Sequence, residues 1–295
     1  MLQFLFEKLD RRIRELQAAV YEPRLALADW RFHNGRLDGG AAVDLDDSAW
    51  PEIRLGDRWG EAGRYAWFRR RVRIPTEWAG RPVCLFLSLH AYVPHVVEDA
   101  LLTSESLVYI HGVPVQGIDR HHREVLLTDC ARGGEEFLVA IEAFAGMNPG
   151  LRTFAVADLA GIDRDTEALY FDARAAFEAA RLLDENNPAQ PALLNALNEA
   201  FLQLEPRQPR GSAWRASLTR ARDHLRARLA AYDDGAQPSI VAAGHAHIDV
   251  AWLWPLSVTR GKAARTFATV LKLMEQYPEY RFTQSQPQLY RFVQE

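Results

Sequence analysis

The spacing of apolar residues changes twice along the 295-residue chain, and these changes constrain its architecture more than any other feature. Between about Leu25 and Gly150, apolar residues alternate or form short runs separated by Gly, Pro and Asp, as in β-strands joined by turns. From about Asp158 the apolar spacing is close to that of helices. After Pro238 the pattern reads strand, helix, strand. We therefore predict a multidomain protein that contains both α and β structure.

The first long region, residues 25–157, is predicted to be a β-sandwich of the jelly-roll kind. Its clearest strand signals are the segments YAWFRRRVRIP, PVCLFLSL, LVYIHGVPVQG and EEFLVAIEAFAG. The third of these is typical of a hairpin with a Gly-containing turn. In the fourth, Phe137, Val139 and Ile141 alternate along the segment, which predicts a strand that is buried on one face.

Helices are predicted on both sides of this region. Residues 1–24 hold an N-terminal helix, which we expect to dock on the protein rather than on a membrane. Its apolar residues at helical spacing are Leu2, Leu5, Leu9, Ile13 and Leu16. Residues 158–238 are predicted to be a helical connector, with helices at about 166–184, 192–204 and 212–232. The second of these opens with Pro191, a residue suited to a first helical turn.

The last region, residues 239–295, is predicted to be a βαβ unit. Ile240–Gly244 forms the first strand, about Arg260–Gln276 the helix, and YRFTQSQ the second strand. The stripe expected to be buried consists of Ala263, Phe267, Val270, Leu271 and Met274. Such units build parallel sheets, whose ligands gather at the C-terminal ends of the strands.

Composition excludes several classes of protein. A formal net charge of −4 argues against a nucleic-acid partner. Cys84 and Cys130 are too few for a disulfide framework. No apolar run approaches the roughly 20 residues of a membrane span, and the N-terminus lacks the pattern of a signal peptide. We therefore expect a cytoplasmic protein without a membrane partner.

The segment IVAAGHAHIDVAWLWP, Ile240 to Pro255, carries the strongest chemical signal. In an extended chain His245, His247 and Asp249 face the same side, and two neighbours can converge on one ion. Imidazole and carboxylate are common ligands of zinc. Because the outer two lie about 13 Å apart in a straight strand, we expect two ligands from this segment and others from elsewhere. A pair of hydrogen-bonded histidines without metal is the alternative.

With its continuation, this segment resembles a known family. GHAHIDVAWLWP followed by a helix and RFTQSQPQLYRFV is similar to the start of the catalytic domain of family 38 glycoside hydrolases, the retaining α-mannosidases. Upstream, DDSAWPEIRLGDRWG, YAWFRRRVRIPTEWAGRPV and LVYIHGVPVQGIDRHHREVLL are similar to the N-terminal β domain of the cytosolic and vacuolar-type members. The resemblance covers nearly the whole chain, and residues 239–295 would then begin a parallel α/β barrel.

The resemblance implies that His247 and Asp249 bind zinc, with Co²⁺ as the alternative metal. It makes Trp252 part of the wall around a terminal mannose, and it places His245 behind the ligands or near the substrate. The implied substrates are α-mannoside oligosaccharides, cleaved in two steps by a carboxylate nucleophile and a carboxyl acid/base. Association into a homo-oligomer stays open.

No catalytic residue is assigned within the chain. The family's nucleophile, acid/base and remaining zinc ligands belong to later strands, which we expect beyond Glu295, and Asp249 does not replace the nucleophile. We therefore expect an N-terminal part of a longer enzyme that is inactive alone. Gln284 and Gln286 either contact the site or form hydrogen bonds at the strand end.

Other interpretations compete with this one. The chain could be a non-catalytic carbohydrate-binding or assembly module with a vestigial metal motif, or a metallohydrolase of the amidohydrolase type, whose barrel also opens with HxH. The segment IDRHHREVLL offers His121 and His122 beside Asp119 and Glu124 as a second metal cluster. Adjacent histidines in a strand point to opposite faces, which favours a surface loop or hairpin edge.

Overall fold

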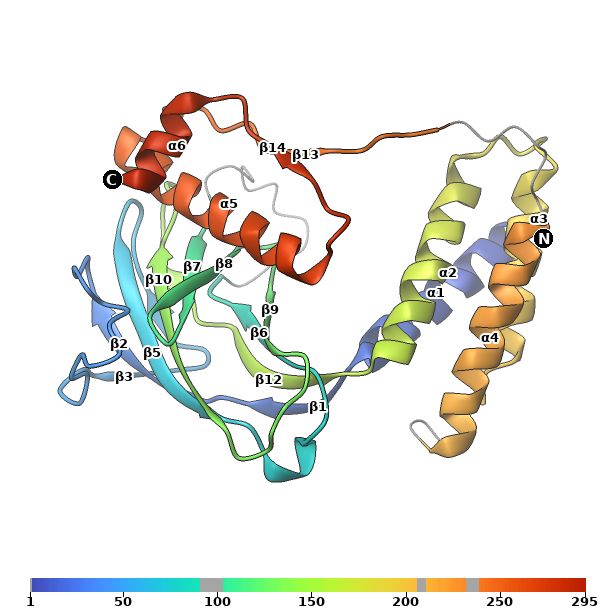
Figure 1. Ribbon diagram of the computed structural model, residues 1–295, viewed down its shortest axis with the longest axis horizontal. Coiled ribbons are helices and arrows are strands. Elements are labelled where there is room, and N and C mark those ends of the chain that lie inside the picture. Colours follow the sequence, from blue (N-terminus) through green and yellow to red (C-terminus); the bar gives the residue numbers. More distant parts are fainter. Residues whose placement is uncertain (1, 91–102, 206–210, 232–238) are drawn as a thin grey trace. The chain divides into compact units, whose positions relative to one another are not determined.

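The residues that the computed structural model describes are 2–90, 103–205, 211–231 and 239–295 (Figure 1). They form two compact units, and each unit is built from two separate stretches of chain. We call Met1–Pro23 with Gly161–Ile240 the helical unit, and Arg24–Ala160 with Val241–Glu295 the β unit.

The helical unit consists of α1 (Leu2–Val20), α2 (Arg164–Leu182), α3 (Ala189–Leu202) and α4 (Ser212–Ala230). The predicted helices therefore exist, although α2 and α3 begin two to three residues earlier than expected. Asp163 explains the start of α2, because its carboxylate accepts a hydrogen bond from the Thr166 N–H at 3.0 Å and caps the first turn. Pro191 lies within the first turn of α3.

Helix α1 packs on another helix of its own unit, so the predicted docking on the protein is confirmed. Its side chains Leu9, Ile13 and Leu16 are buried, and the helix packs on α2. The rings of Phe6 and Phe177 meet edge to face with centroids 5.8 Å apart. Over the described residues, every helix is too short or too polar to cross a membrane.

The β unit contains a four-stranded and a six-stranded sheet. In spatial order the first is β1 (Tyr21–Ala26), β12 (Val156–Ile162), β6 (Val83–Ser88) and β9 (Glu124–Thr128). The second is β3 (Glu52–Arg54), β2 (Asp29–Asn34), β5 (Tyr65–Arg73), β10 (Glu136–Phe144), β7 (Glu105–Ile110) and β8 (Val113–Ile118). Two short strands, β4 (Arg58–Trp59) and β11 (Arg152–Thr153), pair with each other, and Thr76–Trp78 forms a single 3-10 turn. The predicted hairpin is β7–β8, which turns at His111–Gly112.

One apolar core contains side chains from both sheets, so the predicted sandwich is confirmed. Phe68 and Ile141 come from the six-stranded sheet, and Leu85 and Leu159 come from the four-stranded sheet. All four are fully buried. Burying the inner faces of two sheets against each other is what fixes such an architecture.

Strand β10 is buried on both faces, which corrects the prediction of a half-buried strand. Leu138 and Ala140, on the face opposite Val139, are 2% and 1% exposed. The strand lies between β5 and β7 in the sheet. Its outer face is also covered: Trp254 and Val258 pack on Phe144 at the end of β10.

Arg69 ties a surface loop to the outer face of the six-stranded sheet. Its side chain is 1% exposed, and its Nε donates to Asp47 Oδ2 at 2.8 Å. Its Nη1 and Nη2 donate to the carbonyls of Gly40 at 2.7 Å and Ala42 at 3.1 Å. Gly40 lies so close to Trp67 that a Cβ would come within 2.4 Å of the indole ring. The guanidinium and the missing Cβ together allow the loop to lie flat on the sheet.

The C-terminal part of the β unit consists of β13 (Gly244–His245), α5 (Leu256–Gln276), β14 (Phe282–Thr283) and α6 (Pro287–Gln294). Strands β13 and β14 pair in parallel, as the predicted βαβ unit requires. The predicted strand at 240–244 is wrong for all but its last residue, since Ile240 and Val241 are 83% and 95% exposed. Strands β13 and β14 have two residues each, so the ladder between them is only two residues long.

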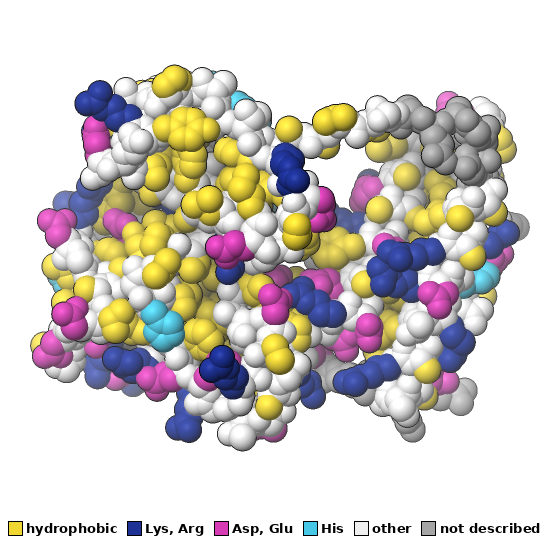
Figure 2. Space-filling model, viewed as in Figure 1, with side chains coloured by type: hydrophobic (Ala, Val, Ile, Leu, Met, Phe, Trp, Pro, Cys, Tyr) yellow, Lys and Arg dark blue, Asp and Glu magenta, His cyan; other side chains and the backbone are white. Residues whose placement is uncertain are grey.

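Helix α5 lies against β7 and β8. Ala263 and Val270 of the predicted stripe are buried, but Leu271 and Met274 are 61% and 36% exposed, which corrects the prediction for these two residues. In Figure 2 exposed apolar side chains gather over α5 and α6. The face of α5 that meets the sheet includes polar side chains instead. Among them, Thr269 Oγ1 accepts a hydrogen bond from the Gly117 N–H at 2.9 Å.

Candidate functional site

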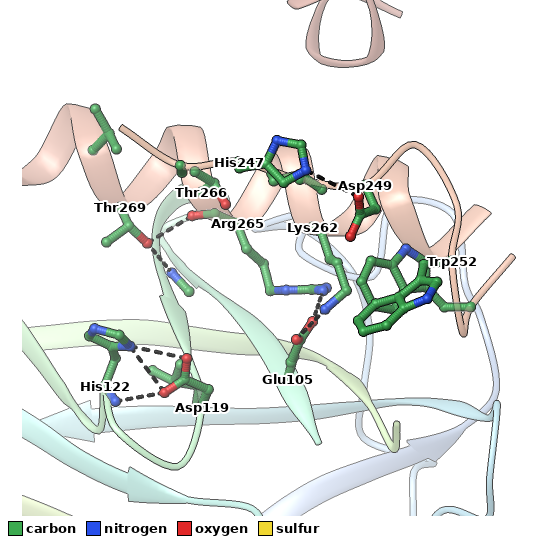
Figure 3. Close-up of a pocket in the computed structure, with 16 residues that line it drawn as sticks. Glu105, Asp119, His122, His247, Asp249, Trp252, Lys262, Arg265, Thr266 and Thr269 are labelled. Atoms are coloured by element: carbon green, nitrogen blue, oxygen red, sulfur yellow. Dashed lines mark hydrogen bonds and ion pairs between the residues drawn. The ribbon is translucent and has the colours of Figure 1, made fainter. Parts of the chain in front are cut away.

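A cavity of about 510 Å³ lies between α5, the segment that follows β13, and the strands β7 and β8 (Figure 3). Its upper wall in this view carries His247, Asp249 and Trp252. The opposite wall carries Asp119 and His122 from the end of β8. The cavity therefore brings together residues from both stretches of chain that build the β unit.

His247 and Asp249 converge at this cavity. The distance from His247 Nε2 to Asp249 Oδ1 is 3.1 Å, and both side chains are open to solvent. Ile248 between them is 7% exposed and packs with Ala263 and Leu289 under α5 and α6. Because side chains alternate in extended backbone, burial of Ile248 turns its two neighbours to the opposite side.

His245 lies apart from this pair. Its Nε2 is 3.2 Å from the hydroxyl of Ser285, and its side chain is not part of the cavity wall. The period of two places all three predicted residues on one side, but β13 ends at His245, and the His245 side chain contacts Ser285 instead of the other two. The structure thus brings two of the three together.

The two tryptophans have different surroundings. Both line the cavity, but Trp252 is 56% exposed, whereas Trp254 is 7% exposed and packs on Phe144. The two rings meet edge to face with centroids 6.0 Å apart. Trp254 Nε1 donates to Thr259 Oγ1 at 3.0 Å, and Lys262 Nζ lies 4.5 Å from its ring centroid. Trp254 is therefore mainly a core residue that supports Trp252, and Trp252 is the more exposed of the two rings at the cavity.

The donor atoms of His247 and Asp249 fit a shared metal ion. A tetrahedral zinc ion with ligands at about 2.0–2.2 Å holds two ligand atoms roughly 3.4 Å apart. The observed separation of 3.1 Å is close to that value. Over the described residues, no group of three or more His, Cys, Asp or Glu side chains is arranged to hold a metal, at this cavity or elsewhere. His247 and Asp249 therefore offer two ligand atoms, one nitrogen and one oxygen.

The backbone of this segment is held by side chains on both sides. Gln284 donates to the carbonyl of Ala246, and Gln286 bonds to both the N–H and the C=O of Ile248. Thr259 of α5 donates to the carbonyl of Asp249 at 3.4 Å. Of the two roles considered for the glutamines, hydrogen bonding at the strand end is the one observed.

An ion-pair cluster joins the two walls of the cavity. Glu105 of β7 pairs with both Lys262 and Arg265 of α5, and all three side chains are at most 20% exposed (Figure 3). Gly117 of β8 permits this docking, since a Cβ there would lie 3.0 Å from Arg265 Cβ. Sequence reasoning missed this cluster. Its only local signal is that Glu105 begins a strand next to apolar residues.

Asp119 and His122 form a tight pair at the cavity edge. His122 Nδ1 is 3.0 Å from Asp119 Oδ2, and the backbone N–H groups of His121 and His122 also donate to this carboxylate. Burial works to raise the pKa of Asp119, but these hydrogen bonds outweigh it and lower the pKa to about 2. The hydrogen bond to Asp119 raises the pKa of His122. Because the carboxylate is engaged in closing a turn between β8 and β9, which belong to different sheets, the structure supports the surface-loop interpretation of this segment.

Two sequence families match the chain. Residues 31–171 match the alpha-mannosidase jelly roll domain, and residues 237–295 match the glycosyl hydrolases family 38 N-terminal domain. Alpha-mannosidase 2C1 of Homo sapiens is 30% identical over 261 residues, which are 81% of this chain and 23% of that protein. Alpha-mannosidase G of Dictyostelium discoideum is 23% identical over 88% of this chain and 24% of its own length. The chain thus spans about a quarter of the length of these relatives.

Among solved structures, a family 2 glycosyl hydrolase from Bacteroides cellulosilyticus DSM 14838 superposes with a TM-score of 0.35. It is 20% identical and covers 47% of this chain and 20% of its own, an extent that supports no conclusion about function. Residues 31–171 are thus similar to the jelly roll domain of α-mannosidases, and residues 237–295 are similar to the N-terminal domain of family 38 glycosyl hydrolases.

Proposed function

We propose that the chain is the N-terminal part of a zinc-dependent, retaining α-mannosidase that removes terminal α-linked mannose from oligosaccharides. The observation that carries this proposal is the convergence of His247 and Asp249 beside the exposed face of Trp252. The similarity to α-mannosidases from three organisms supports the same reaction.

Each of these residues has a role in the proposal. His247 Nε2 and Asp249 Oδ1 hold the metal, which when bound would supply a Lewis acid for substrate hydroxyl groups. Trp252 offers a flat apolar face on which a sugar ring can stack. His245, through its contact with Ser285, steadies the end of β13. Orientation of the sugar by these contacts lowers the entropy cost of reaching the transition state.

Retention of anomeric configuration needs two carboxyl groups about 5–5.5 Å apart, one as nucleophile and one as acid/base. We assign neither role to a residue of this chain, because Asp249 is used as a ligand. In the proposal β13, α5 and β14 are the first βαβ unit of a parallel α/β barrel, and the two carboxylates stand on other strands of that barrel. By itself the chain is then inactive.

The test uses the protein purified from the organism that makes it. Its intact mass is measured first, and hydrolysis of an aryl α-mannoside is then followed with and without a chelator. We expect the chelator to abolish activity and zinc to restore it. Asp249→Asn should lower kcat/KM more than 100-fold, since loss of even an indirect partner of a metal ligand costs about 10–100-fold. Glu275→Gln on the exposed end of α5 is the matched control and should have no effect.

Three results would contradict the proposal. An intact mass equal to the 33.5 kDa of this chain would rule out the enzyme and make sugar binding by the β-sandwich the question to pursue. Full activity of Asp249→Asn would rule out its role as a metal ligand. Activity on cyclic amides instead of α-mannosides would favour a metallohydrolase of the amidohydrolase type.

A further inference from the structure

We propose that Gln286, oriented by Gln284, is the positioning residue that sets the geometry of the His247–Asp249 pair. This inference rests on the proposed function only in naming a metal as what the pair holds. Neither glutamine lines the cavity: Gln286 acts on the backbone between the two ligands, and Gln284 acts on the residue before His247.

The side-chain amide of Gln286 makes the two backbone hydrogen bonds that a neighbouring strand would make to Ile248. Its Oε1 accepts a hydrogen bond from the Ile248 N–H at 3.1 Å, and its Nε2 donates to the Ile248 C=O at 2.8 Å. A primary amide is the side chain that can do both, because it carries a donor and an acceptor in one plane. The β13–β14 ladder ends at His245 and Thr283, so Gln286 extends the pairing three residues past the last paired residue of β13.

Gln284 fixes the orientation of Gln286. Its side chain is buried, its Nε2 donates to the Ala246 carbonyl, and its Oε1 accepts from the Gln286 N–H at 3.0 Å. The two glutamines thus hold Ala246 and Ile248, the residues that flank His247. Together we call them the glutamine clamp.

The clamp matters because Ile248 lies between the two ligands. Any rotation of its peptide planes moves the His247 and Asp249 side chains in different directions, and their donor atoms no longer meet. The buried Ile248 side chain anchors the residue from one side only. The hydrogen bonds of Gln286 fix the remaining freedom, so losing them should weaken the metal site without removing a ligand.

Gln286→Met tests the clamp, because methionine has nearly the same length and volume but no amide. Gln288→Met is the matched control, since Gln288 is exposed on the first turn of α6. In Zn²⁺ titrations of the intact protein, as purified from the organism that makes it, we expect the Kd to rise about 10-fold or more for Gln286→Met, within the range known for residues behind a metal ligand. The control should stay within twofold. Gln286→Glu keeps the acceptor and loses the donor, so its Kd should lie between those of the wild type and the methionine variant.

Two further measurements separate positioning from general stability. The visible spectrum of the Co²⁺-loaded chain reports ligand geometry and should change for Gln286→Met but not for Gln288→Met. In the metal-free chain, hydrogen exchange at the Ile248 amide should be at least 10-fold faster in Gln286→Met. Three results for Gln286→Met would each overturn the clamp. These are an unchanged Kd, an unchanged Co²⁺ spectrum, and an unchanged rate of hydrogen exchange at the Ile248 amide. Absence of zinc binding in the wild type, with the exchange effect present, would overturn the proposed metal site and support the clamp.

Discussion

Replacing Arg69 by methionine should destabilise the β unit strongly. Methionine keeps most of the aliphatic chain, so the change isolates the guanidinium. Three hydrogen bonds are lost, to Asp47 and to the carbonyls of Gly40 and Ala42, at a site where Arg69 is 1% exposed. Breaking a buried ion pair by removing one partner costs about 3–5 kcal/mol. The 28% exposure of the Asp47 side chain lets water solvate the carboxylate that is left, so we expect the lower part of that range, about 3 kcal/mol.

Differential scanning calorimetry measures this effect. For a folded unit of about 150–250 residues, each kcal/mol lowers the Tm by about 2–4 °C, so Arg69→Met should lower the Tm of the β unit by roughly 6–12 °C. The control is Arg71→Met on the same strand, whose ion pair with Glu136 is 61% and 49% exposed. An exposed pair contributes about 0–1 kcal/mol, so its Tm should shift by at most a few degrees. Equal shifts in the two variants would refute the reasoning from burial.

Two further changes probe the β unit. Gly40→Ala should destabilise it, because the new Cβ would lie 2.4 Å from the Trp67 ring and force the loop away from the sheet. The fall in Tm should be partly reversed by Trp67→Leu in the same chain, and independent effects of the two changes would argue against the clash. His122→Gln should make Tm less dependent on pH. The lowered pKa of Asp119 stabilises the fold above about pH 4 and less as pH falls toward 2, whereas the raised pKa of His122 stabilises it below about pH 6.5 and less as pH rises further. The Tm difference from the wild type should therefore be largest between about pH 4 and 6.5, and a difference that grows above pH 8 would contradict this pairing.

Local sequence patterns predicted the elements whose environment is local. The β7–β8 hairpin follows from alternating residues around His111–Gly112, and α1 follows from apolar residues at helical spacing. The convergence of His247 and Asp249 follows from the period of two. In each case the residues that decide the structure are close together in the chain.

Features that depend on distant partners were not predicted. Ile240 and Val241 look like a buried strand, but neither is paired and both are exposed. Leu271 and Met274 have the spacing of a buried stripe, yet α5 turns another face to β7 and β8. The Glu105–Lys262 pair joins residues 157 positions apart, and nothing in either local sequence indicates the other. The docking of α5 decides the second and third of these outcomes.

The division of the helical unit between two stretches of chain has a consequence during synthesis. Helix α1 leaves the ribosome before its partner α2, which follows only after the whole of Arg24–Ala160 has been made. At about 5–20 residues per second this takes roughly 7–30 s, during which the apolar face formed by Leu9, Ile13 and Leu16 has no partner. The β-sandwich can begin to fold in that interval, whereas α1 must be kept from aggregating. The nascent chain should therefore depend on chaperones most between the appearance of α1 and that of α2.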